Sequence, residues 1–356
     1  MAVSIPIFYS SQLANFNFGP GHPFTGERFE SYTALLEKSS VMDKCEFLPL
    51  ETAKEEDLLL VHTPEYLKLV KFYEETGGYL SMDTPVTPSV VEIQALITGS
   101  GLQAAKLLVE GAENTAHTFG GFHHAGRDYG EGFCVYNDVA IVAEALIKRH
   151  GLRRILILDT DAHQGNGTMD VFYTNPNVLF VSIHQDPRTL YPGKGFTWEI
   201  GKNEGKGYTV NLPMPPYAGT GQYDLVFDEI VTPISKEFAP DVIIRNGGSD
   251  PYHADALTNL GLDLDGLYKL GKSVSAISDA TCGRLLDMMV SGYGNMVIYG
   301  WLALFCGLEG LDIDYKSASP EEPGHLHEPD NEGLTSCTEA MIGDLRAHLR
   351  EYWTSI

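Results

Sequence analysis

Residues 155–163 read ILILDTDAH, and this stretch decides the fold. Its first four residues form a short apolar run, which predicts a strand buried on both faces, as in a parallel sheet. Alternation along an extended chain directs Asp159, Asp161 and His163 to one side. In open α/β sheets, ligands bind where strands end. The sequence therefore predicts two carboxylates and an imidazole gathered at the end of a buried strand.

Apolar strands and helical segments alternate along the rest of the chain. This pattern predicts an α/β fold with a central parallel sheet, helices on both faces and the active site at the carboxyl ends of the strands. No internal repeat or linker is evident, so residues 1–356 are expected to form one domain. Strands are expected at 5–9, 45–50, 115–119, 154–158, 178–183, 241–245 and 286–290. Helices are expected at 28–38, 90–110, 138–150, 224–238, 264–282 and 338–353, and a further helix is expected to begin at 63. Loops are expected at 77–89 and 317–332.

The composition is strongly acidic, with 48 Asp and Glu against 24 Lys and Arg and a formal charge of −24. This charge argues against nucleic acid as a partner, because phosphate binding requires a basic surface. It suits a cationic substrate through long-range steering, although most of these carboxylates are expected simply to solvate the surface.

Several features predict a soluble, cytoplasmic protein. The five cysteines are dispersed without a CxxC motif, which indicates reduced thiols. The first ten residues lack the basic start and apolar core of a signal peptide. The longest apolar stretch, Met296–Leu308, is too short to span a bilayer, so no membrane partner is expected.

Asp161, His163 and Asp250 are candidate metal ligands. Two carboxylate oxygens and one imidazole nitrogen suit Zn²⁺, with Fe²⁺ as the alternative ion, and three protein ligands leave a coordination position for water. Taken alone, the Asp-x-His pattern fits a structural hydrogen-bond cluster equally well. The buried strand before Asp161, and the position of Asp250 at another strand end, favour the metal.

Two adjacent histidines and one tyrosine are candidates for proton transfer and charge stabilisation. His123 and His124 follow two glycines, and one can serve as general base and the other as electrostatic partner or general acid. Asp159 and Asn166 are available as their orienting partners. Tyr293 lies between two glycines and could stabilise an oxyanion by ~3 kcal/mol, although surface histidine pairs and packed tyrosines are common. Two aromatic residues, Phe133 after Gly132 and Tyr191 before Pro192, could line an aliphatic channel or simply pack in the core.

Together, these segments resemble the metal-dependent superfamily of histone deacetylases, acetylpolyamine amidohydrolases and acetoin-utilisation proteins. The block at 120–138 is the most specific match. The matching motifs run in the family's order: HP-x4-R at 22–28, GGFHHAGRDYGEGFCVYND at 120–138, DTDAHQGNGT at 159–168, SIHQDPRTLYPGKG at 182–195, NGGSD at 246–250 and SGYG at 291–294.

The resemblance implies an arginase-deacetylase-like fold and a role for each matched residue. It implies metal ligands at Asp161, His163 and Asp250, and pairs His123 with Asp159 and His124 with Asn166. It makes Tyr293 the transition-state tyrosine. The remaining implied roles are channel walls at Phe133 and Tyr191 beside Gly132, a rim aspartate at Asp83, an acetate-release channel near Arg28, and a K⁺ or Na⁺ site at Asp159, Ser182 and Ile183 with the carbonyls of Asp161 and His163.

Three residues depart from the family pattern. Gln164 stands where many members have a second histidine, Asn166 replaces the aspartate of the classical histone enzymes, and Ser291 replaces a glycine before the tyrosine. None of these departures removes a metal ligand, so an active site is expected. The position of Tyr293 depends on the glycine-rich loop around it.

The expected function is hydrolysis of an N-acetylated, cationic amine such as acetyl-lysine or acetylpolyamine. An arginase-like ureohydrolase with two metals is one alternative, and a non-catalytic acetyl-amine binding protein is another. The oligomeric state is left open, and an oligomer is compatible with the sequence. His325 and His327 are expected to lie on a solvated loop.

Overall fold

The computed structural model describes residues 4–39, 41–324 and 331–356, so His325 and His327 lie outside the described residues. The chain divides into two compact units, each built from three segments. The first comprises residues 1–153, 165–171 and 285–290, and the second 154–164, 172–284 and 291–356. The single domain expected over 1–356 stays a prediction.

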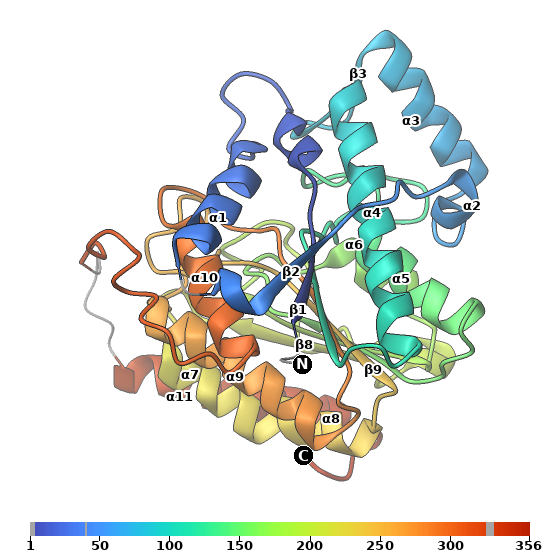
Figure 1. Ribbon diagram of the computed structural model, residues 1–356. Coiled ribbons are helices and arrows are strands. Elements are labelled where there is room, and N and C mark those ends of the chain that lie inside the picture. The colour runs from blue at the N-terminus through green and yellow to red at the C-terminus, as the bar shows by residue number, and fades with distance from the viewer. Residues whose placement is uncertain (1–3, 40, 325–330) are drawn as a thin grey trace. The chain divides into compact units, whose positions relative to one another are not determined.

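The first unit contains four parallel strands with one long helix packed on them. Helix α4 (Pro88–Val109) contacts two of these strands, β5 and β10. It lies beside α5 (Asp138–Lys148), as Figure 1 shows. The strand order is β2 (Cys45–Leu48), β1 (Ile5–Phe8), β5 (Thr115–Thr118) and β10 (Leu285–Met288). Its other helices are α1 (Glu27–Lys38), α2 (Glu55–Leu58), α3 (Pro64–Thr76), nearly all of α6 (Asn166–Phe172), and the 3-10 helices Ser11–Asn15 and Met42–Lys44.

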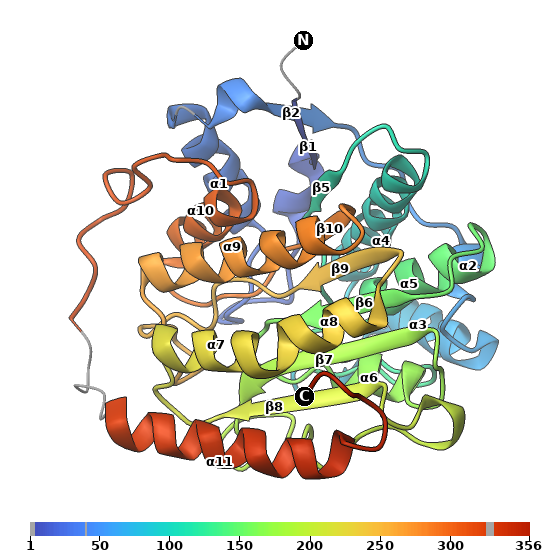
Figure 2. The same cartoon turned by 90° about the horizontal axis from the view of Figure 1, so that it is seen from below.

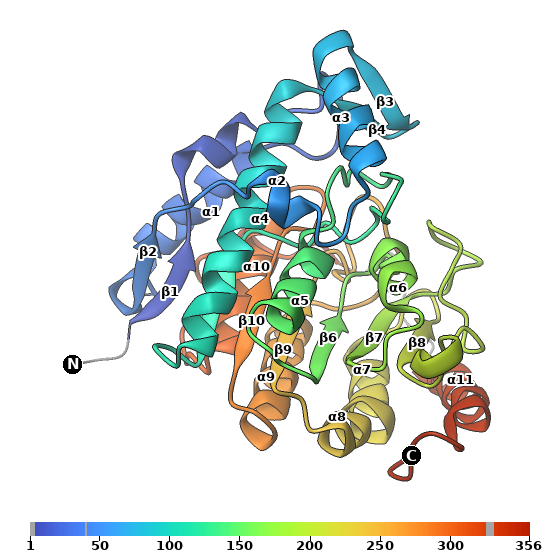
Figure 3. The same ribbon diagram turned by 90° about the vertical axis from the view of Figure 1, so that its right-hand side faces the viewer.

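The prediction of a loop at 77–89 is wrong in part, because this segment contains a small antiparallel hairpin. Strands β3 (Gly78–Ser81) and β4 (Thr84–Val86) pair with each other, and α3 packs against both (Figure 3). Pro85 reduces the strand signal in the sequence, but the hairpin tolerates it opposite Tyr79. Helix α4 begins two residues earlier than expected, where Thr87 Oγ1 accepts the Val90 N–H at 3.2 Å.

The second unit also contains four parallel strands, in the order β9 (Val242–Asn246), β6 (Ile155–Asp159), β7 (Val178–Gln185) and β8 (Thr209–Met214) (Figure 2). Every residue of β6 is buried, which confirms the predicted central strand. The register aligns Asp159 with Ser182 on one neighbour and Asn246 on the other. The polar ends of three strands therefore lie level with one another.

Two predicted helices of the second unit differ from the structure. The single helix expected at 224–238 is interrupted by a π-helical segment, Phe227–Val231, just before Pro233, which cannot donate a helical hydrogen bond. The last helix begins at 331 rather than 338, and it packs against β8. Strand β8 was not predicted, because Pro213 weakens its strand signal. The helices are α7 (Thr220–Val226), α8 (Thr232–Phe238), α9 (Leu264–Ala280), α10 (Val297–Leu308) and α11 (Asn331–Leu349), and a 3-10 helix spans Asn203–Gly205.

The other predicted strands and helices agree with the structure to within about two residues at most ends, whereas helices α2, α6 and α10 were not predicted. In the part of the chain that the structure describes, every helix falls short of the length or apolarity that crossing a membrane demands.

Candidate metal centre and histidine pair

The candidate metal centre lies in the second unit, at the end of β6. Asp159 Oδ1 accepts the Asp161 N–H at 3.2 Å and Asn246 Nδ2–H at 3.1 Å. Asp161 Oδ1 in turn accepts the His163 N–H at 2.8 Å. These contacts hold the residues after β6 in a compact turn, so the side chains of Asp161 and His163 are fixed close to the strand end.

Asp161, His163 and Asp250 converge as the sequence predicts. His163 Nδ1 lies 3.2 Å from Asp161 Oδ1 and 3.1 Å from Asp250 Oδ2. One potential ligand atom from each of the three residues lies within 4.8 Å of the other two, and all three residues are buried. Two carboxylate oxygens and one imidazole nitrogen are therefore close enough to bind a single ion.

The electrostatics of this cluster favour a cation. Burial, with the charge of Asp161 next, raises the pKa of Asp250 well above its usual value. Burial by itself lowers the pKa of His163, but hydrogen bonds and charge from Asp161 and Asp250 outweigh it and raise the pKa to about 10. Two buried carboxylates therefore draw positive charge to the position beside Nδ1. A nitrogen and two oxygens are a donor set that fits Zn²⁺.

Asp250 is held by contacts on both of its carboxylate oxygens. Ser291 Oγ donates to Oδ1 at 2.8 Å, and the Ala162 N–H donates to Oδ2 at 3.2 Å. Thr258 Oγ1 donates to the Asp250 carbonyl at 2.5 Å. From the sequence, Ser291 was recognised only as a departure from a glycine, and nothing in its local pattern indicates this contact with a candidate ligand.

Tyr293 lies beside a candidate metal ligand. Its ring centroid is 6.3 Å from that of His163, with the two ring planes at 88°, and the side chain is buried. The loop around it depends on glycine, because Gly292 and Gly294 have φ of +125° and +103°. The structure thus places the Tyr293 ring next to the candidate ligand His163.

Asp255 fixes the main chain of this tyrosine. Its Oδ2 accepts the Tyr293 N–H at 2.6 Å, and its Oδ1 accepts the Leu257 N–H at 2.8 Å. Burial raises the pKa of Asp255 to about 7, against the opposing effect of these hydrogen bonds. Both carboxylate oxygens of Asp255 are engaged. Within residues 4–39, 41–324 and 331–356, the one cluster of three candidate metal ligands is Asp161, His163 and Asp250. The second metal of an arginase-like site has no corresponding cluster there.

The histidine pair lies in the first unit, after β5. The rings of His123 and His124 have centroids 4.2 Å apart. Asp138, at the start of α5, holds the loop that carries them, because its carboxylate accepts the N–H groups of Gly121 at 2.9 Å and Phe122 at 2.7 Å. Burial raises the pKa of Asp138 to about 6, although these hydrogen bonds lower it. Asp138 belongs to the recognised motif, but its role in holding the loop was not predicted.

His124 has a defined partner in the same unit. Its Nδ1 lies 2.7 Å from Asn166 Oδ1, and Asn166 Nδ2 donates to Glu131 Oε1 at 2.6 Å. Because an amide oxygen only accepts, His124 Nδ1 carries the proton and Nε2 is left as the basic nitrogen. Glu131 was not predicted as a site residue.

A tight turn joins Glu131 to Phe133. The Cys134 N–H donates to the Glu131 carbonyl at 2.9 Å, and Gly132 and Phe133 have φ of +57° and +70°. A Cβ at Gly132 would lie 2.4 Å from His124 Cδ2, so only glycine fits there. A left-handed phenylalanine is uncommon and marks a position under constraint.

The same turn contacts the hairpin that carries Asp83. The Gly132 N–H donates to Asp83 Oδ1 at 3.2 Å, and the Phe133 N–H donates to Thr84 Oγ1 at 3.0 Å. Ser81 Oγ also donates to Asp83 Oδ1, at 2.5 Å. The candidate rim aspartate and the candidate channel wall Phe133 therefore belong to one hydrogen-bonded assembly in the first unit.

The other predicted residues occupy varied environments. Tyr191, in the second unit, is 40 % exposed, and Ile183 is buried in β7. Ser182 Oγ lies 2.9 Å from His184 Nδ1, and His184 Nε2 lies 2.9 Å from the Gly195 carbonyl, so the hydroxyl donates to Nδ1 and its lone pairs face elsewhere. Arg28 is buried in the first unit and donates to the carbonyls of Pro23, Thr25 and Val290.

Comparison with known proteins identifies the family. The histone deacetylase domain matches residues 22–306. A probable deacetylase of Archaeoglobus fulgidus is 35% identical over 329 residues, covering 90% of each chain. The acetoin utilization protein AcuC of Staphylococcus aureus is 33% identical over 315 residues, covering 84% of this chain and 80% of AcuC.

The fold agrees with this assignment. The crystal structure of the HDA15 HD domain superimposes with a TM-score of 0.83 at 24% identity, covering 98% of this chain and 97% of the other. The predicted α/β fold of the arginase-deacetylase type is confirmed. The chain belongs to the histone deacetylase family.

Proposed function

We propose that this protein is a metal-dependent amidohydrolase that removes an acetyl group from an N-acetylated amine. The observation that carries the proposal is the buried cluster of Asp161, His163 and Asp250, which lies inside the matched deacetylase domain. These three residues would hold Zn²⁺ or Fe²⁺. The bound ion supplies Lewis-acid polarisation of the acetyl carbonyl and lowers the pKa of a water molecule.

The histidine pair handles the protons in this proposal. His124 takes a proton from the attacking water through Nε2, since Asn166 keeps its Nδ1 protonated. His123, which the family pattern pairs with Asp159, is the electrostatic partner, and either histidine protonates the leaving amine. The histidine pair and the candidate metal ligands all fall within residues 22–306, the matched domain, which supports assigning them to one reaction.

Tyr293 donates its hydroxyl to the oxyanion that forms at the acetyl carbon. Its position beside His163 supports this role. A donor aimed at developing negative charge is worth ~3 kcal/mol in a site of this type. The products are acetate and a free amine.

The substrate is assigned to a cationic, N-acetylated amine, acetyl-lysine in a protein or an acetylated polyamine. Phe133 and Tyr191 are the proposed walls of the channel, with Gly132 beside Phe133. Asp83, whose Oδ1 is anchored to the Gly132 N–H, is the proposed contact for the substrate at the rim. The charge of −24 favours approach of a cation.

A structural K⁺ or Na⁺ is proposed near the end of β6, bound by Asp159, Ser182 and Ile183. The hydrogen bond from Ser182 to His184 leaves the lone pairs of Ser182 Oγ available to such an ion.

The decisive experiment measures amine release from an acetyl-lysine peptide and an acetylated polyamine, with protein loaded with Zn²⁺ or Fe²⁺. We expect turnover on at least one substrate, and preference between them defines the substrate class. Asp250→Asn is the control, because it removes a carboxylate ligand and should abolish both metal binding and turnover. Full turnover by this variant, or none by the metal-loaded wild type on a panel of acyl amides, would contradict the proposal.

A further inference from the structure

We infer that Glu131 is a positioning residue that sets the protonation pattern of His124 through Asn166. This inference rests on the proposed deacetylase function and deepens it. The three side chains form a continuous chain within the first unit, from Glu131 Oε1 to Asn166 Nδ2 at 2.6 Å and from Asn166 Oδ1 to His124 Nδ1 at 2.7 Å.

Three polar neighbours surround the Asn166 amide: Glu131, His124 and the hydroxyl of Tyr129. An ionised carboxylate has only acceptors, so the NH₂ end of Asn166 must face Glu131. The oxygen then faces His124, which must donate from Nδ1. Glu131 and His124 each satisfy one end of the amide, at 2.6 and 2.7 Å, and the acceptor-only chemistry of the carboxylate decides which end faces it.

The consequence for His124 is a fixed tautomer. With Nδ1 protonated, Nε2 keeps its lone pair and can accept a proton from water. If the amide turned over, its NH₂ would face Nδ1 and select the opposite tautomer, with the proton on Nε2. That form cannot act as a base through Nε2. Glu131 prevents this inversion, because it cannot donate to an amide oxygen.

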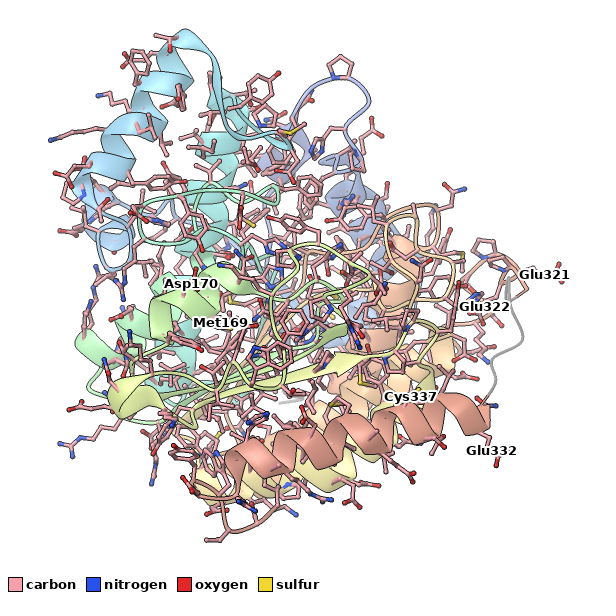
Figure 4. All side chains as sticks on the ribbon, turned by 180° about the vertical axis from the view of Figure 1, so that it is seen from behind. Met169, Asp170, Glu321, Glu322, Glu332 and Cys337 are labelled. Carbon is pink, nitrogen blue, oxygen red and sulfur yellow. The ribbon has the colours of Figure 1, made fainter. Side chains whose placement is uncertain are left out.

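The backbone places Glu131 for this contact. It begins the tight turn to Cys134, and the next residue, Gly132, lies directly against the His124 ring. Two further groups face this network. Tyr129 Oη donates to Asp170 Oδ2 at 2.6 Å, so its oxygen can only accept from Asn166, which favours the same amide orientation as Glu131 does. Burial and the hydrogen bond and charge of Asp170 raise the pKa of Tyr129, so it stays neutral. Asp170 lies on α6, near Met169 (Figure 4).

This arrangement differs from the pattern of the classical histone enzymes that the sequence resembles, in which an aspartate replaces Asn166. Here the carboxylate charge stands one residue further from the imidazole, with an amide between them. The amide can be inverted and an aspartate cannot, so Asn166 needs a fixed neighbour to act as an acceptor. Glu131 supplies that neighbour.

The test uses four variants. Glu131→Ala removes the acceptor, and Glu131→Gln replaces it with an amide that can face Asn166 either way. Asn166→Asp combined with Glu131→Ala gives His124 a carboxylate directly and should rescue the tautomer. Asp128→Ala is the matched control, because it removes an exposed negative charge from the same loop.

The first measurement is the tautomer of His124 in metal-free protein, read from ¹⁵N chemical shifts of the ring. We expect the wild type to carry the proton on Nδ1, Glu131→Ala to contain a substantial Nε2–H population, and Glu131→Gln to fall between them. The double variant and Asp128→Ala should match the wild type. An unchanged tautomer in Glu131→Ala would overturn the inference whatever the activity.

The second measurement is turnover with metal-loaded protein. Glu131→Ala should lose about 10-fold in kcat with little change in KM, as is typical when the partner of an active-site histidine is removed. The double variant should recover most of this loss. If the His124 tautomer depends on Glu131 but the protein shows no deacetylase turnover, the positioning role stands and the proposed function is contradicted. If Glu131→Ala has a normal kcat, the positioning role is contradicted.

Discussion

Ser291 Oγ donates a hydrogen bond of 2.8 Å to Asp250 Oδ1, while Asp250 Oδ2 faces His163 Nδ1 at 3.1 Å. The two oxygens of the Asp250 carboxylate therefore make different contacts: Oδ2 faces the candidate ligand His163, and Oδ1 accepts from the loop that carries Tyr293. Ser291 is itself fixed, because its carbonyl accepts Trp301 Nε1–H at 2.7 Å and the Ser249 N–H at 3.0 Å. A glycine at this position could not make the side-chain contact.

Replacing Ser291 with glycine or alanine should weaken metal binding about 10-fold, because the partner that orients a ligand is lost. Competition with a chromophoric chelator measures this affinity directly. Ser249→Ala is the control, since Ser249 Oγ donates to the Val297 carbonyl and not to a candidate ligand. Equal affinities in Ser291→Ala and wild type would show that Asp250 needs no such support.

Removing the hydroxyl of Tyr293 should affect turnover but not the metal. Tyr293→Phe is expected to reduce kcat ~10²-fold, the scale of one oxyanion donor, while the bound metal stays at the wild-type level. Steady-state kinetics alongside metal analysis separate the two effects. Retention of full turnover would refute the assigned role.

Asp255 should make stability depend on pH. Its pKa is about 7 in the folded protein, above the ordinary value of 3.8, so the folded state holds a proton that the unfolded state has released between these values. The wild type should therefore lose stability relative to Asp255→Asn as the pH rises from about 4 to about 7, and the difference should then level off. Urea unfolding of both metal-free proteins across this range measures the difference. A constant difference would mean that Asp255 is ionised throughout.

Asp138 should be important for stability as well as for the histidine loop. Asp138→Ala would leave the buried N–H groups of Gly121 and Phe122 without their acceptor, at a cost of roughly 1–3 kcal/mol each. Asp138→Asn keeps one acceptor oxygen and should cost less. Chemical denaturation compares the two, and a loss below that of a typical surface substitution would contradict the assignment.

The sequence predicted those features that depend on short-range pattern. The strand before Asp159 is a continuous apolar run, and Asp161 and His163 are two residues apart, so their convergence follows from local geometry. Asp250 was recognised because it also ends a strand. Proline explains the missed strands, since Pro85 and Pro213 weaken the strand signals of β3–β4 and β8, and Pro233 divides the expected helix. The unpredicted helices α2, α6 and α10 contain no proline.

Contacts between side chains distant in sequence could not be predicted in this way. Glu131 and Asn166 are 35 residues apart, and Asp250 and Ser291 are 41 apart. Neither contact has a periodic or motif signature, because each depends on how two loops meet after the strands have formed. The departures at Asn166 and Ser291 were visible as unusual residues, but their partners were not.

The position of Asp138 has a consequence for how the first unit opens. Asp138 is the first residue of α5, and its carboxylate also accepts hydrogen bonds from the N–H groups of Gly121 and Phe122. Fraying of the first turn of α5 would therefore release the loop that carries His123 and His124. We expect the amides of Gly121 and Phe122 to exchange with solvent deuterium at the same rate as the amides of that first turn, so that helix and loop open as one cooperative unit.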